Sequence, residues 1–391
     1  MVADHAPALP ADNGQMLRVA IIGAGLGGLC LAHGLARRGT AVTVYERDDG
    51  PAARYQGYRI HIGPAGARAL AECLAPDAYE LFLATAGRTG RQVTVLSRRL
   101  RQLKVMPGHV APGEVSVPVD RQTLRAIMLA GLPDGVRFGH ELTHSETVGD
   151  HVRAFFGNGG CAEADVVVGA DGVGSAVRAQ LLPAAEPVGS GGLVCGKTPL
   201  TDRSRALLPA AVREGFVAVS GFPRPVGLAL GLMEFTRRPG QLGLPDSADY
   251  LMWAVGAPAS RFPPGLRDLA PEELRDSVLR LIRRWHPDVR DLVGLSDPAS
   301  TFALTVRTGV EVAAWQPSRV TVLGDAIHAM QPAGGSGANV ALRDAALLSR
   351  TLTGCDPEAV VPAIGRYERE MTGYGFAAML AAQQASRRFA R

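Results

Sequence analysis

Cysteine is scarce in this chain and follows no recognisable spacing. The five cysteines among 391 residues, Cys30, Cys73, Cys161, Cys195 and Cys355, are isolated and form no CxxC pair. An odd, scattered set argues against a zinc site and against a disulfide framework, so we expect a protein of the reducing cytoplasm. The sequence also lacks an HxxxH pattern or a carboxylate–histidine cluster, and we expect no metal ion.

Concentrated charge is the second missing feature. The formal net charge is only +4, from 41 Lys and Arg against 37 Asp and Glu. The arginines are scattered and no basic run follows one helix face, which argues against nucleic acid as a partner. A small molecule that carries phosphate accounts for these arginines equally well.

The sequence also lacks a secretory signal and an uninterrupted membrane-spanning run. Residues 1–16 have neither the basic nor the apolar region of a signal peptide, and we expect a flexible leader. Residues 19–36 are apolar, but their glycines occupy strand–turn–helix positions and Arg37 and Arg38 follow directly. We therefore expect no membrane span.

A βαβ unit stands near the N-terminus. Residues 17–25 are typical of a buried strand, 26–39 of a helix that Gly39 closes, and 41–48 of a second buried strand. This pattern predicts a parallel sheet covered on both faces. Further helices are expected over 63–74 and 119–132, and another buried strand over 164–172.

The pattern changes between about residues 190 and 300. Segments 215–222, 226–235 and 249–258 predict antiparallel strands, and 271–289 predicts one amphipathic helix. The buried-strand pattern returns at 318–326, and helices are expected from near Asn339 and over 357–388. We predict a discontinuous α/β domain at 17–185 and 300–391. It is interrupted at 186–299 by a smaller α+β substrate domain with a mostly antiparallel sheet, to which 75–118 can contribute.

Gly23, Gly25 and Gly28 form a GxGxxG turn between the first strand and its helix. The first glycine permits the tight turn, the second lets the backbone approach a pyrophosphate, and the third allows close helix–strand packing. Glu46 ends the second strand, 18 residues after Gly28, where a carboxylate accepts hydrogen bonds from ribose hydroxyls. An acid here favours FAD or NAD over NADP, whose 2′-phosphate it would repel.

A second glycine-rich stretch follows the strand at 318–326. Residues 334–337 hold three glycines in four positions, shortly after Pro332. Such density costs backbone entropy and contributes no packing, so the pattern indicates that a ligand approaches the backbone. Asp325 lies at the carboxyl end of the strand, where open α/β sheets bind ligands. A helix N-cap or a turn acid is the alternative for Asp325.

Three segments in this order resemble the FAD-dependent aromatic hydroxylases, the single-component class A flavoprotein monooxygenases. They are "GAGLGGL…YERD", "DVVVGADGVGSAVR" and "VLGDAIHAMQPAGGSGANVALRDAALL". The resemblance covers about residues 17–385 and is weakest between about 190 and 300. It implies a discontinuous, Rossmann-like FAD-binding domain of the GR2 type.

The resemblance also implies roles for the third segment. Asp325 would take the ribityl hydroxyls of FAD, and Pro332 would lie beside the flavin ring. The helix that begins near Asn339 offers unpaired N–H groups and a partial positive charge, which would stabilise the anionic reduced ring. The residues assigned to this seat are Gly335, Gly337, Ala338 and Asn339.

Other cofactor contacts come from the first two segments and from one helix start. Arg121, in the first turn of a helix, would lie near the ribityl and phosphate region; a solvated surface arginine is the alternative. Arg47 and Arg54 would meet the adenine half or the incoming nicotinamide, or equally remain on the surface. Asp171 would contact FAD and NAD(P)H, although a plain turn explains the following Gly172 almost as well.

The substrate residues are the least specific. His61 aligns with a position near the flavin edge, but a histidine between two isoleucines is more often simply packed. Met233 and Phe235 alternate on one expected strand, and Met252 and Trp253 lie on another, where they form either a pocket or the small domain's own core. A pocket of these residues would suit a large apolar ligand, such as a polyketide or another aromatic natural product.

The implied activity is that of an FAD-dependent monooxygenase. The chain has no second GxGxxG unit, so NADPH or NADH would dock transiently, reduce FAD and leave. In the family, reduced flavin and O2 then give a C4a-hydroperoxide that hydroxylates an aromatic substrate. Because the cofactor performs this chemistry, we assign no catalytic side chain. The alternatives are an FAD-dependent reductase or dehydrogenase of the same fold, and a non-catalytic FAD-fold escort protein.

The chain departs from other members of the family in two ways, and both narrow the expected activity. The chain stops after "QQASRRFAR", without the thioredoxin-like domain that larger family members append. None of its three tryptophans sits in a WxWxIP segment, which disfavours halogenation. A monomer and a homodimer both remain open.

Overall fold

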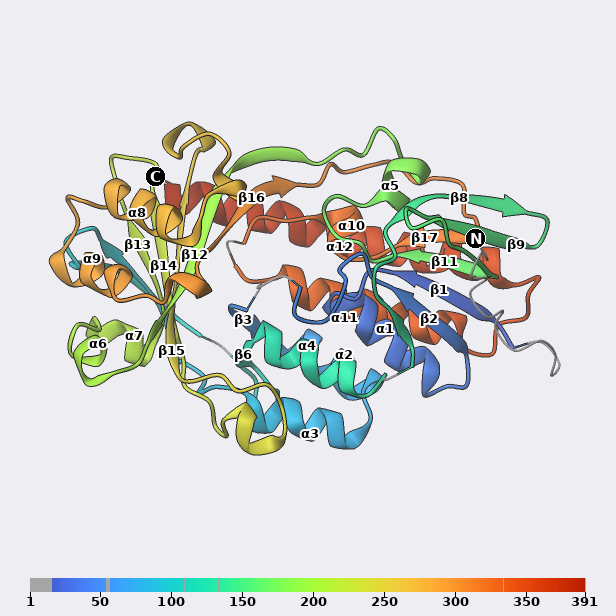
Figure 1. Ribbon diagram of the computed structural model, residues 1–391, viewed down its shortest axis with the longest axis horizontal. Coiled ribbons are helices and arrows are strands. Elements are labelled where there is room, and N and C mark those ends of the chain that lie inside the picture. The colour runs from blue at the N-terminus through green and yellow to red at the C-terminus, as the bar shows by residue number, and fades with distance from the viewer. Residues whose placement is uncertain (1–15, 54–56, 109, 133, 333, 391) are drawn as a thin grey trace.

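The computed structural model describes residues 16–53, 57–108, 110–132, 134–332 and 334–390. Within them, a parallel five-stranded sheet forms the centre of one lobe (Figure 1). Its strands, in spatial order, are β17 (Val320–Val322), β11 (Val166–Gly169), β1 (Arg18–Ile22), β2 (Ala41–Tyr45) and β7 (Val136–Arg137). All four residues of β11 and four of the five in β1 are buried, as expected for parallel strands covered on both faces.

Helices cover one face of this sheet, and a small antiparallel sheet covers the other. Helix α1 (Leu26–Ala36) lies on β1 and β2. Helices α2 (Pro64–Cys73), α4 (Arg121–Ala130) and α11 (Gly337–Leu352) pack on α1, and α12 (Val360–Ala390) packs on α11. The small sheet consists of β8 (Leu142–Val148), β9 (His151–Phe156) and β10 (Cys161–Ala164), with β9 and β10 against the parallel strands. The remaining short helices of this lobe are α3 (Pro76–Thr85), α5 (Ala176–Leu181) and α10 (Asp325–His328).

A seven-stranded sheet dominates the second lobe. Its spatial order is β16 (Phe302–Thr308), β12 (Val188–Pro199), β15 (Tyr250–Ala257), β14 (Gly227–Met233), β13 (Gly215–Ser220), β4 (Gln92–Ser97) and β5 (Gln102–Pro107). All neighbours run antiparallel except β13 and β4. Because β4 and β5 join this sheet, residues 92–107 share a layer with the middle of the chain. The predicted domain bounds stay a prediction.

One face of the seven-stranded sheet packs on helices. These are α6 (Asp202–Ala206), α7 (Ala210–Glu214), α8 (Pro271–Leu281) and α9 (Pro287–Gly294), with 3₁₀ turns at Pro239–Leu242, Ala259–Arg261, Leu266–Asp268 and Pro298–Ser300. Leu251, Trp253 and Val255 of β15 point into this core, and Tyr250 and Met252 point to the opposite face. That opposite face is the one available to the first lobe.

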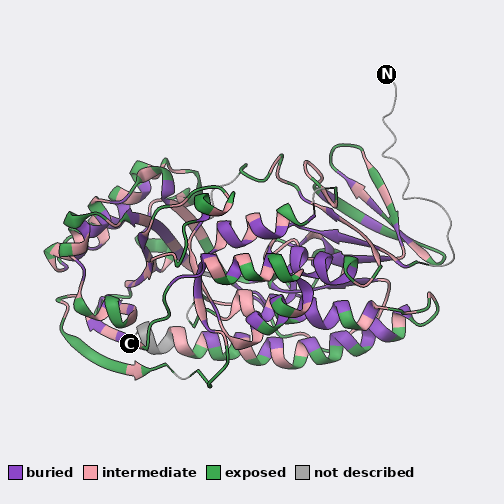
Figure 2. Cartoon of the chain, turned by 90° about the horizontal axis from the view of Figure 1, so that it is seen from below, coloured by how far each residue is buried: buried purple, intermediate pink, exposed green. Residues whose placement is uncertain are grey.

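Two elements join the lobes. The two-stranded ribbon of β3 (Arg59–Ile62) and β6 (Val117–Asp120) contacts β14. Helix α12 runs along the first lobe and reaches β13 of the second (Figure 1). Figure 2 shows α12 with exposed residues along its outer side and buried residues concentrated inside the molecule.

Two sequence expectations need correction. The helix predicted over 271–289 is two helices, because Pro287 has no N–H and forces the preceding His286 into an extended conformation (φ −54°, ψ 138°). The helix expected from near Asn339 begins two residues earlier, at Gly337. The first turn of α11 is therefore made by the glycine-rich segment itself.

Candidate functional site

The turn between β1 and α1 uses its three glycines in three different ways. Gly23 has φ +108°, and a Cβ there would lie 2.5 Å from the carbonyl oxygen of Ala170. A Cβ at Gly28 would lie 2.1 Å from the carbonyl oxygen of Gly23. At Gly25, by contrast, no described atom lies within 4 Å of the Cβ position. The space above Gly25, at the start of α1, can therefore hold a ligand phosphate.

Glu46 supports this turn from β2. Its carboxylate is buried and accepts hydrogen bonds from the backbone N–H of Ala24 (2.8 Å) and of Asp48 (3.1 Å). Arg125 of α4 donates to the carbonyl oxygens of Ala24 (2.9 Å) and Pro51 (2.8 Å). Glu46 thus orders the turn in addition to the ribose contact predicted for it. Arg47 is exposed on the surface, and Arg54 lies outside the described residues.

Asp171 follows β11 and faces the same edge of the sheet. Its Oδ2 accepts a hydrogen bond from the backbone N–H of Ala176 (2.8 Å), and its Oδ1 is buried with no partner in the described chain. Burial raises the pKa of the Asp171 carboxyl, and the hydrogen bonds it accepts act in the opposite direction. A buried acceptor without a donor is costly, so Asp171 Oδ1 fits a ligand hydroxyl.

The third motif is held from below by a buried carboxylate. Asp344 of α11 accepts hydrogen bonds from the backbone N–H of Gly324 (2.8 Å), from Nε2 of His328 (2.6 Å) and from the Tyr374 hydroxyl (2.6 Å). Gly324 has φ +62°, which only glycine adopts readily. This network fixes the turn that presents Asp325 at the start of α10.

Asp325 itself points away from this network. Its side chain is exposed, yet it lies in a recess where surrounding protein displaces enough solvent to raise its pKa. The positive charges of His328 and Arg121 oppose that rise. Arg121 is half-buried and stands 5.9 Å from the ring centre of Tyr58. Asp325 and Arg121 are therefore brought together, although 204 positions separate them.

The glycine-rich loop presents bare backbone beside Asp325. Gly334 (φ +100°) and Gly335 (φ +64°) are exposed and need their glycines for conformation. A Cβ at Gly335 or Gly337 would be no closer than 3.7 Å to any described atom, so the adjoining space is open. Pro332 is exposed beside them, and Ala338 is half-buried in the first turn of α11.

Asn339 has a structural task in this arrangement. Its side-chain oxygen accepts a hydrogen bond from the backbone N–H of Gly63 (2.8 Å), and its amide nitrogen donates to the carbonyl oxygens of His61 (2.8 Å) and Gly335 (3.1 Å). The Asn339 side chain thus ties β3 to the glycine-rich loop. A cofactor contact from Asn339 would use its backbone N–H, one of the first in α11.

His61 lies next to this loop and close to the second lobe. The nearest described atom to a Cβ at Gly335 is the His61 Cβ, at 3.9 Å, and His61 Nε2 forms a hydrogen bond with the Ser116 hydroxyl (2.8 Å). Burial lowers the pKa of His61 to about 4, with a further contribution from the charge of Arg59. His61 is therefore neutral near pH 7 and lies beside the proposed flavin seat.

The seven-stranded sheet divides the other predicted substrate residues. Met233 and Met252 pack with Tyr250, Phe216 and Phe235 on the face directed to the first lobe, where Met233 has no exposed surface and Phe235 is half-buried. Phe235 lies beyond the end of β14, where it forms an isolated bridge with Gly87 and its backbone N–H donates to Oδ1 of Asp249 (3.0 Å). Trp253 is wrong as a pocket residue, because side chains alternate along β15 and direct it into the helix-covered core, where none of its surface is exposed.

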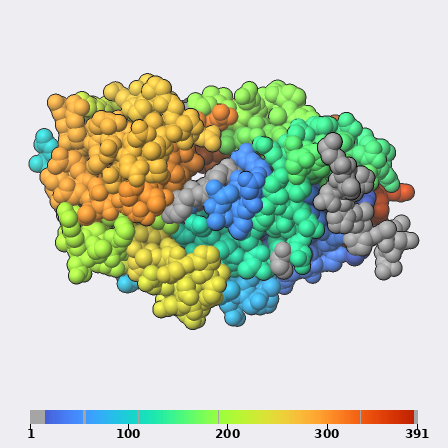
Figure 3. All heavy atoms as spheres, viewed as in Figure 1, coloured from blue at the N-terminus to red at the C-terminus, as the bar shows by residue number. Residues whose placement is uncertain are grey.

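The two lobes enclose a hollow on the face shown in Figure 3, between the strands and helices of the second lobe and the N-terminal part of the first. The residues present fit FAD: an open space over Gly25, an unpartnered acceptor on Asp171, an exposed carboxylate on Asp325 and uncovered glycine backbone. No described helix is long and apolar enough to cross a membrane, and no described group of His, Cys, Asp and Glu could hold a metal ion.

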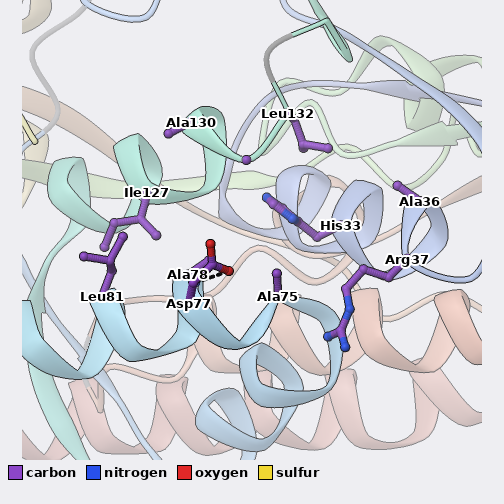
Figure 4. Close-up of a pocket in the computed structure, with 11 residues that line it drawn as sticks. His33, Ala36, Arg37, Ala75, Asp77, Ala78, Leu81, Ile127, Ala130 and Leu132 are labelled. Carbon is purple, nitrogen blue, oxygen red and sulfur yellow. Dashed lines mark hydrogen bonds between the residues drawn. The ribbon is translucent and has the colours of Figure 1, made fainter. Parts of the chain in front are cut away.

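A separate pocket of about 500 Å³ opens between α1, α3 and α4 (Figure 4). It contains none of the predicted site residues. Its only histidine, His33, bonds the carbonyl oxygen of Met128 through Nε2 (2.8 Å), and burial lowers the pKa of His33. None of the predicted cofactor or substrate contacts falls in this pocket, so the hollow between the lobes remains the candidate site.

Several long-range contacts at this site escaped the sequence analysis. Asp120, the N-cap of α4, accepts hydrogen bonds from Lys197 Nζ (2.7 Å) and from the Tyr250 hydroxyl (2.8 Å). Arg59 reaches from β3 onto β14. Asp120 and Lys197 are 77 positions apart in the sequence, and Asp120 and Tyr250 are 130 apart. No local sequence pattern can therefore predict these contacts. Of these polar residues and Asp344, only Asp344 lies within a motif that the sequence analysis recognised, as part of the "RD" of the third segment.

Comparison with known proteins identifies the class. A family model described as an FAD binding domain matches residues 268–378, and one described as an NAD(P)-binding Rossmann-like domain matches residues 21–83. The chain is 30% identical over 357 residues to 3-amino-4-hydroxybenzoate 2-monooxygenase PtnB3 of Streptomyces platensis, covering 90% of this chain and 83% of that one. It is thus an FAD-binding protein with a Rossmann-like domain.

The chain is also similar to two other proteins described as FAD monooxygenases. A crystal structure of a putative FAD-containing monooxygenase from Photorhabdus luminescens has a TM-score of 0.80 and 31% identity, over 95% of this chain and 98% of that one. The dual O-methyltransferase/FAD-dependent monooxygenase elcB of Phaeosphaeria nodorum is 34% identical over 379 residues, which cover 86% of this chain and 40% of that protein. The chain spans only 40–44% of the first curated relatives that it matches.

The chain belongs to the family of FAD-dependent monooxygenases. The predicted family, fold class and FAD cofactor are confirmed.

Proposed function

We propose that this protein hydroxylates an aromatic small molecule, with NADPH or NADH as electron donor and O2 as the source of the added oxygen. One oxygen atom would enter the substrate and the other would leave as water. The observation that carries the proposal is the pairing of two surfaces across one hollow. The glycine backbone and Asp325 belong to the first lobe, and the apolar sheet face with Met252 and Phe235 belongs to the second.

FAD, when bound, would supply the hydride acceptance and the oxygen activation. Asp325 would hold its ribityl hydroxyls and Gly25 would admit its pyrophosphate; Arg121, Asp171 and Glu46 complete the proposed contacts. The start of α11, from Gly337 to Asn339, would face the negative charge of the reduced ring with unpaired N–H groups. Pro332 and Gly335 border the same space.

The chain's own residues would orient the substrate and keep water away from it. Phe235 and Met252 would border a flat aromatic ligand, and Met233, which has no exposed surface, packs behind them. His61, neutral near pH 7, offers a hydrogen-bonding edge between the loop and the sheet. The relatives support an aromatic substrate, since the names of two of them specify 3-amino-4-hydroxybenzoate and 6-hydroxynicotinate. The proposed setting is the cytoplasm, with no nucleic acid partner and with either a monomer or a homodimer.

The test is turnover by the purified, FAD-loaded protein. Aromatic compounds should accelerate NAD(P)H oxidation in the presence of O2 and yield a product heavier by one oxygen atom. Turnover without O2 would favour the reductase alternative. A protein that takes up no FAD would leave only the escort alternative.

A further inference from the structure

Arg59 extends from the first lobe over the face of the seven-stranded sheet. Its Nε donates to the carbonyl oxygen of Leu232 (2.9 Å), and its guanidinium carbon lies 5.7 Å from the ring centre of Phe216. Gly231 makes room for it, because a Cβ there would be 3.0 Å from the Arg59 Cδ and 3.3 Å from its Cζ. The Nε edge of the Arg59 guanidinium is thus held by Leu232, and its two terminal nitrogens form no hydrogen bond with the described chain.

The charge of Arg59 has no counter-ion in the described chain. No described residue accepts a hydrogen bond from its terminal NH groups or forms an ion pair with it. Asp120 stands opposite Arg59 in the β3–β6 ribbon, but its carboxylate bonds Lys197 and Tyr250 instead. Because Arg59 is enclosed without a carboxylate, burial lowers its pKa to about 10, with only Tyr250 opposing.

An enclosed and uncompensated cation is costly, and an anion that binds beside it removes that cost. Arg59 remains charged near pH 7 despite the lowered pKa, and it is half-buried, so a ligand in the hollow can reach it. A guanidinium with free terminal NH groups is suited to two parallel hydrogen bonds from a carboxylate.

The position of Arg59 lies within the proposed substrate space. Arg59 and His61 alternate on β3 and so point to the same side of the strand. His61 adjoins Gly335 of the glycine-rich loop, and Arg59 adjoins Phe216, which packs with Met233 and Met252. A ligand that contacts Arg59 would therefore lie between the loop and the apolar sheet face.

We propose that Arg59 binds an anionic oxygen group of the substrate, so that this protein selects aromatic acids over their neutral counterparts. This inference rests on the proposed function and adds a substrate class to it. A ring carboxylate and an ionised phenol present the same chemistry to the guanidinium, and the experiment separates them.

The experiment measures binding to the FAD-loaded protein from the change in flavin absorbance. One arm compares para-hydroxybenzoate with para-hydroxybenzamide, and the other compares para-nitrophenol with nitrobenzene. We expect the wild type to bind at least one anion about 10- to 100-fold more tightly than its neutral partner, the range for a charge-assisted hydrogen bond. Arg59→Gln should abolish that preference, and Arg59→Lys should retain part of it.

Two further variants keep the result interpretable. Gly231→Ala should weaken anion binding in the same direction, since the new methyl group displaces the arginine. Arg99→Gln, which changes an exposed arginine in the turn between β4 and β5, should leave the preference unchanged. All four variants should keep their FAD.

Equal affinity within both pairs, or no binding of any of the four probes, would overturn the inference. Loss of FAD from Arg59→Gln would also overturn it, because Arg59 would then be a cofactor residue. Failure of the proposed function has a different signature: the wild type itself would take up no FAD or would turn over without O2.

Discussion

His328 and Asp344 meet in the interior of the FAD-binding lobe, with 2.6 Å between Nε2 and Oδ2 and no exposed surface on either side chain. The same carboxylate holds Gly324 and Tyr374. One buried group therefore joins β17, α10, α11 and α12 directly beneath Asp325. The geometry of the proposed flavin seat depends on this contact, although neither residue would touch the cofactor.

Asp344→Asn should destabilise the protein strongly. The amide cannot balance the charge of His328 or accept all three hydrogen bonds, and breaking a buried pair costs about 3–5 kcal/mol. Urea unfolding of the apoprotein measures this loss. Asp356→Asn, at an exposed position of the same lobe, serves as the control and should change little. Equal stability of the two variants would contradict the role given to Asp344.

The same pair predicts a pH dependence of stability. Burial alone would lower the pKa of His328, but the charge of Asp344 and its hydrogen bond raise that pKa above 6.5. His328 therefore keeps its proton to a higher pH in the folded state than in the unfolded state. The stabilisation is complete below 6.5 and is lost as pH rises through the folded-state pKa. The free energy of unfolding should fall over that window in the wild type, and the fall should vanish in His328→Gln.

Gly25 and Gly28 should respond differently to the same substitution. Gly28→Ala places a methyl group 2.1 Å from the Gly23 carbonyl oxygen, so it should unfold or distort the turn. Gly25 has an extended backbone (φ −77°, ψ 177°) and open space, so Gly25→Ala should fold normally. Its methyl group would instead occupy the proposed phosphate position and weaken FAD binding. Circular dichroism and FAD titration separate the effects; a Gly25→Ala protein with normal FAD affinity would disprove the placement.

The sequence alone gives the parts of the site that rest on local backbone rules. Gly23 and Asp325 follow buried strands and Gly28 lies in the first turn of the next helix, and turns after buried strands have a strong signature. The substrate side was harder to predict, because one residue of register separates Met252, on the face toward the first lobe, from Trp253, in the helix-covered core. Arg59 reaches Leu232 across 173 positions, and that contact exists only once two distant strands are packed together.

Asp325→Ala should yield a folded protein with weak FAD affinity. Its carboxylate has a raised pKa and accepts no hydrogen bond from the described chain, so the apoprotein should lose little stability. Each charge-assisted hydrogen bond to a ribityl hydroxyl is worth about 1.5–3 kcal/mol, so the Kd for FAD should rise about tenfold or more. Asp325→Asn should recover part of the affinity. Unchanged FAD retention in Asp325→Ala would refute the ribityl assignment.

Glu368 predicts a second pH dependence of stability. Here the cause is the burial of an acid, whereas for His328 it is the contact with a carboxylate. This glutamate of α12 is 4% exposed, and burial raises its pKa to about 7, against a smaller effect of the hydrogen bond from the Thr321 hydroxyl (2.9 Å). Between 4.5 and about 7 the folded state binds the extra proton, so ionisation destabilises the fold as pH rises. Glu368→Gln should stabilise the protein by about 1–3 kcal/mol above that window and little below it. Glu370→Gln, exposed on the same helix, should show no such difference.

Met252 and Trp253 provide a matched pair on adjacent positions of β15. Trp253 fills the helix-covered core and has no exposed surface, so Trp253→Ala should cost about 3–5 kcal/mol of stability through the cavity it leaves. Met252 contacts Met233 and Tyr250 on the face toward the hollow, so Met252→Ala should enlarge the proposed pocket. It should alter KM for aromatic substrates while FAD content stays constant. Thermal unfolding and a substrate series measured on both variants decide between these roles. A Met252→Ala enzyme with the wild-type substrate profile would place the pocket elsewhere on the sheet.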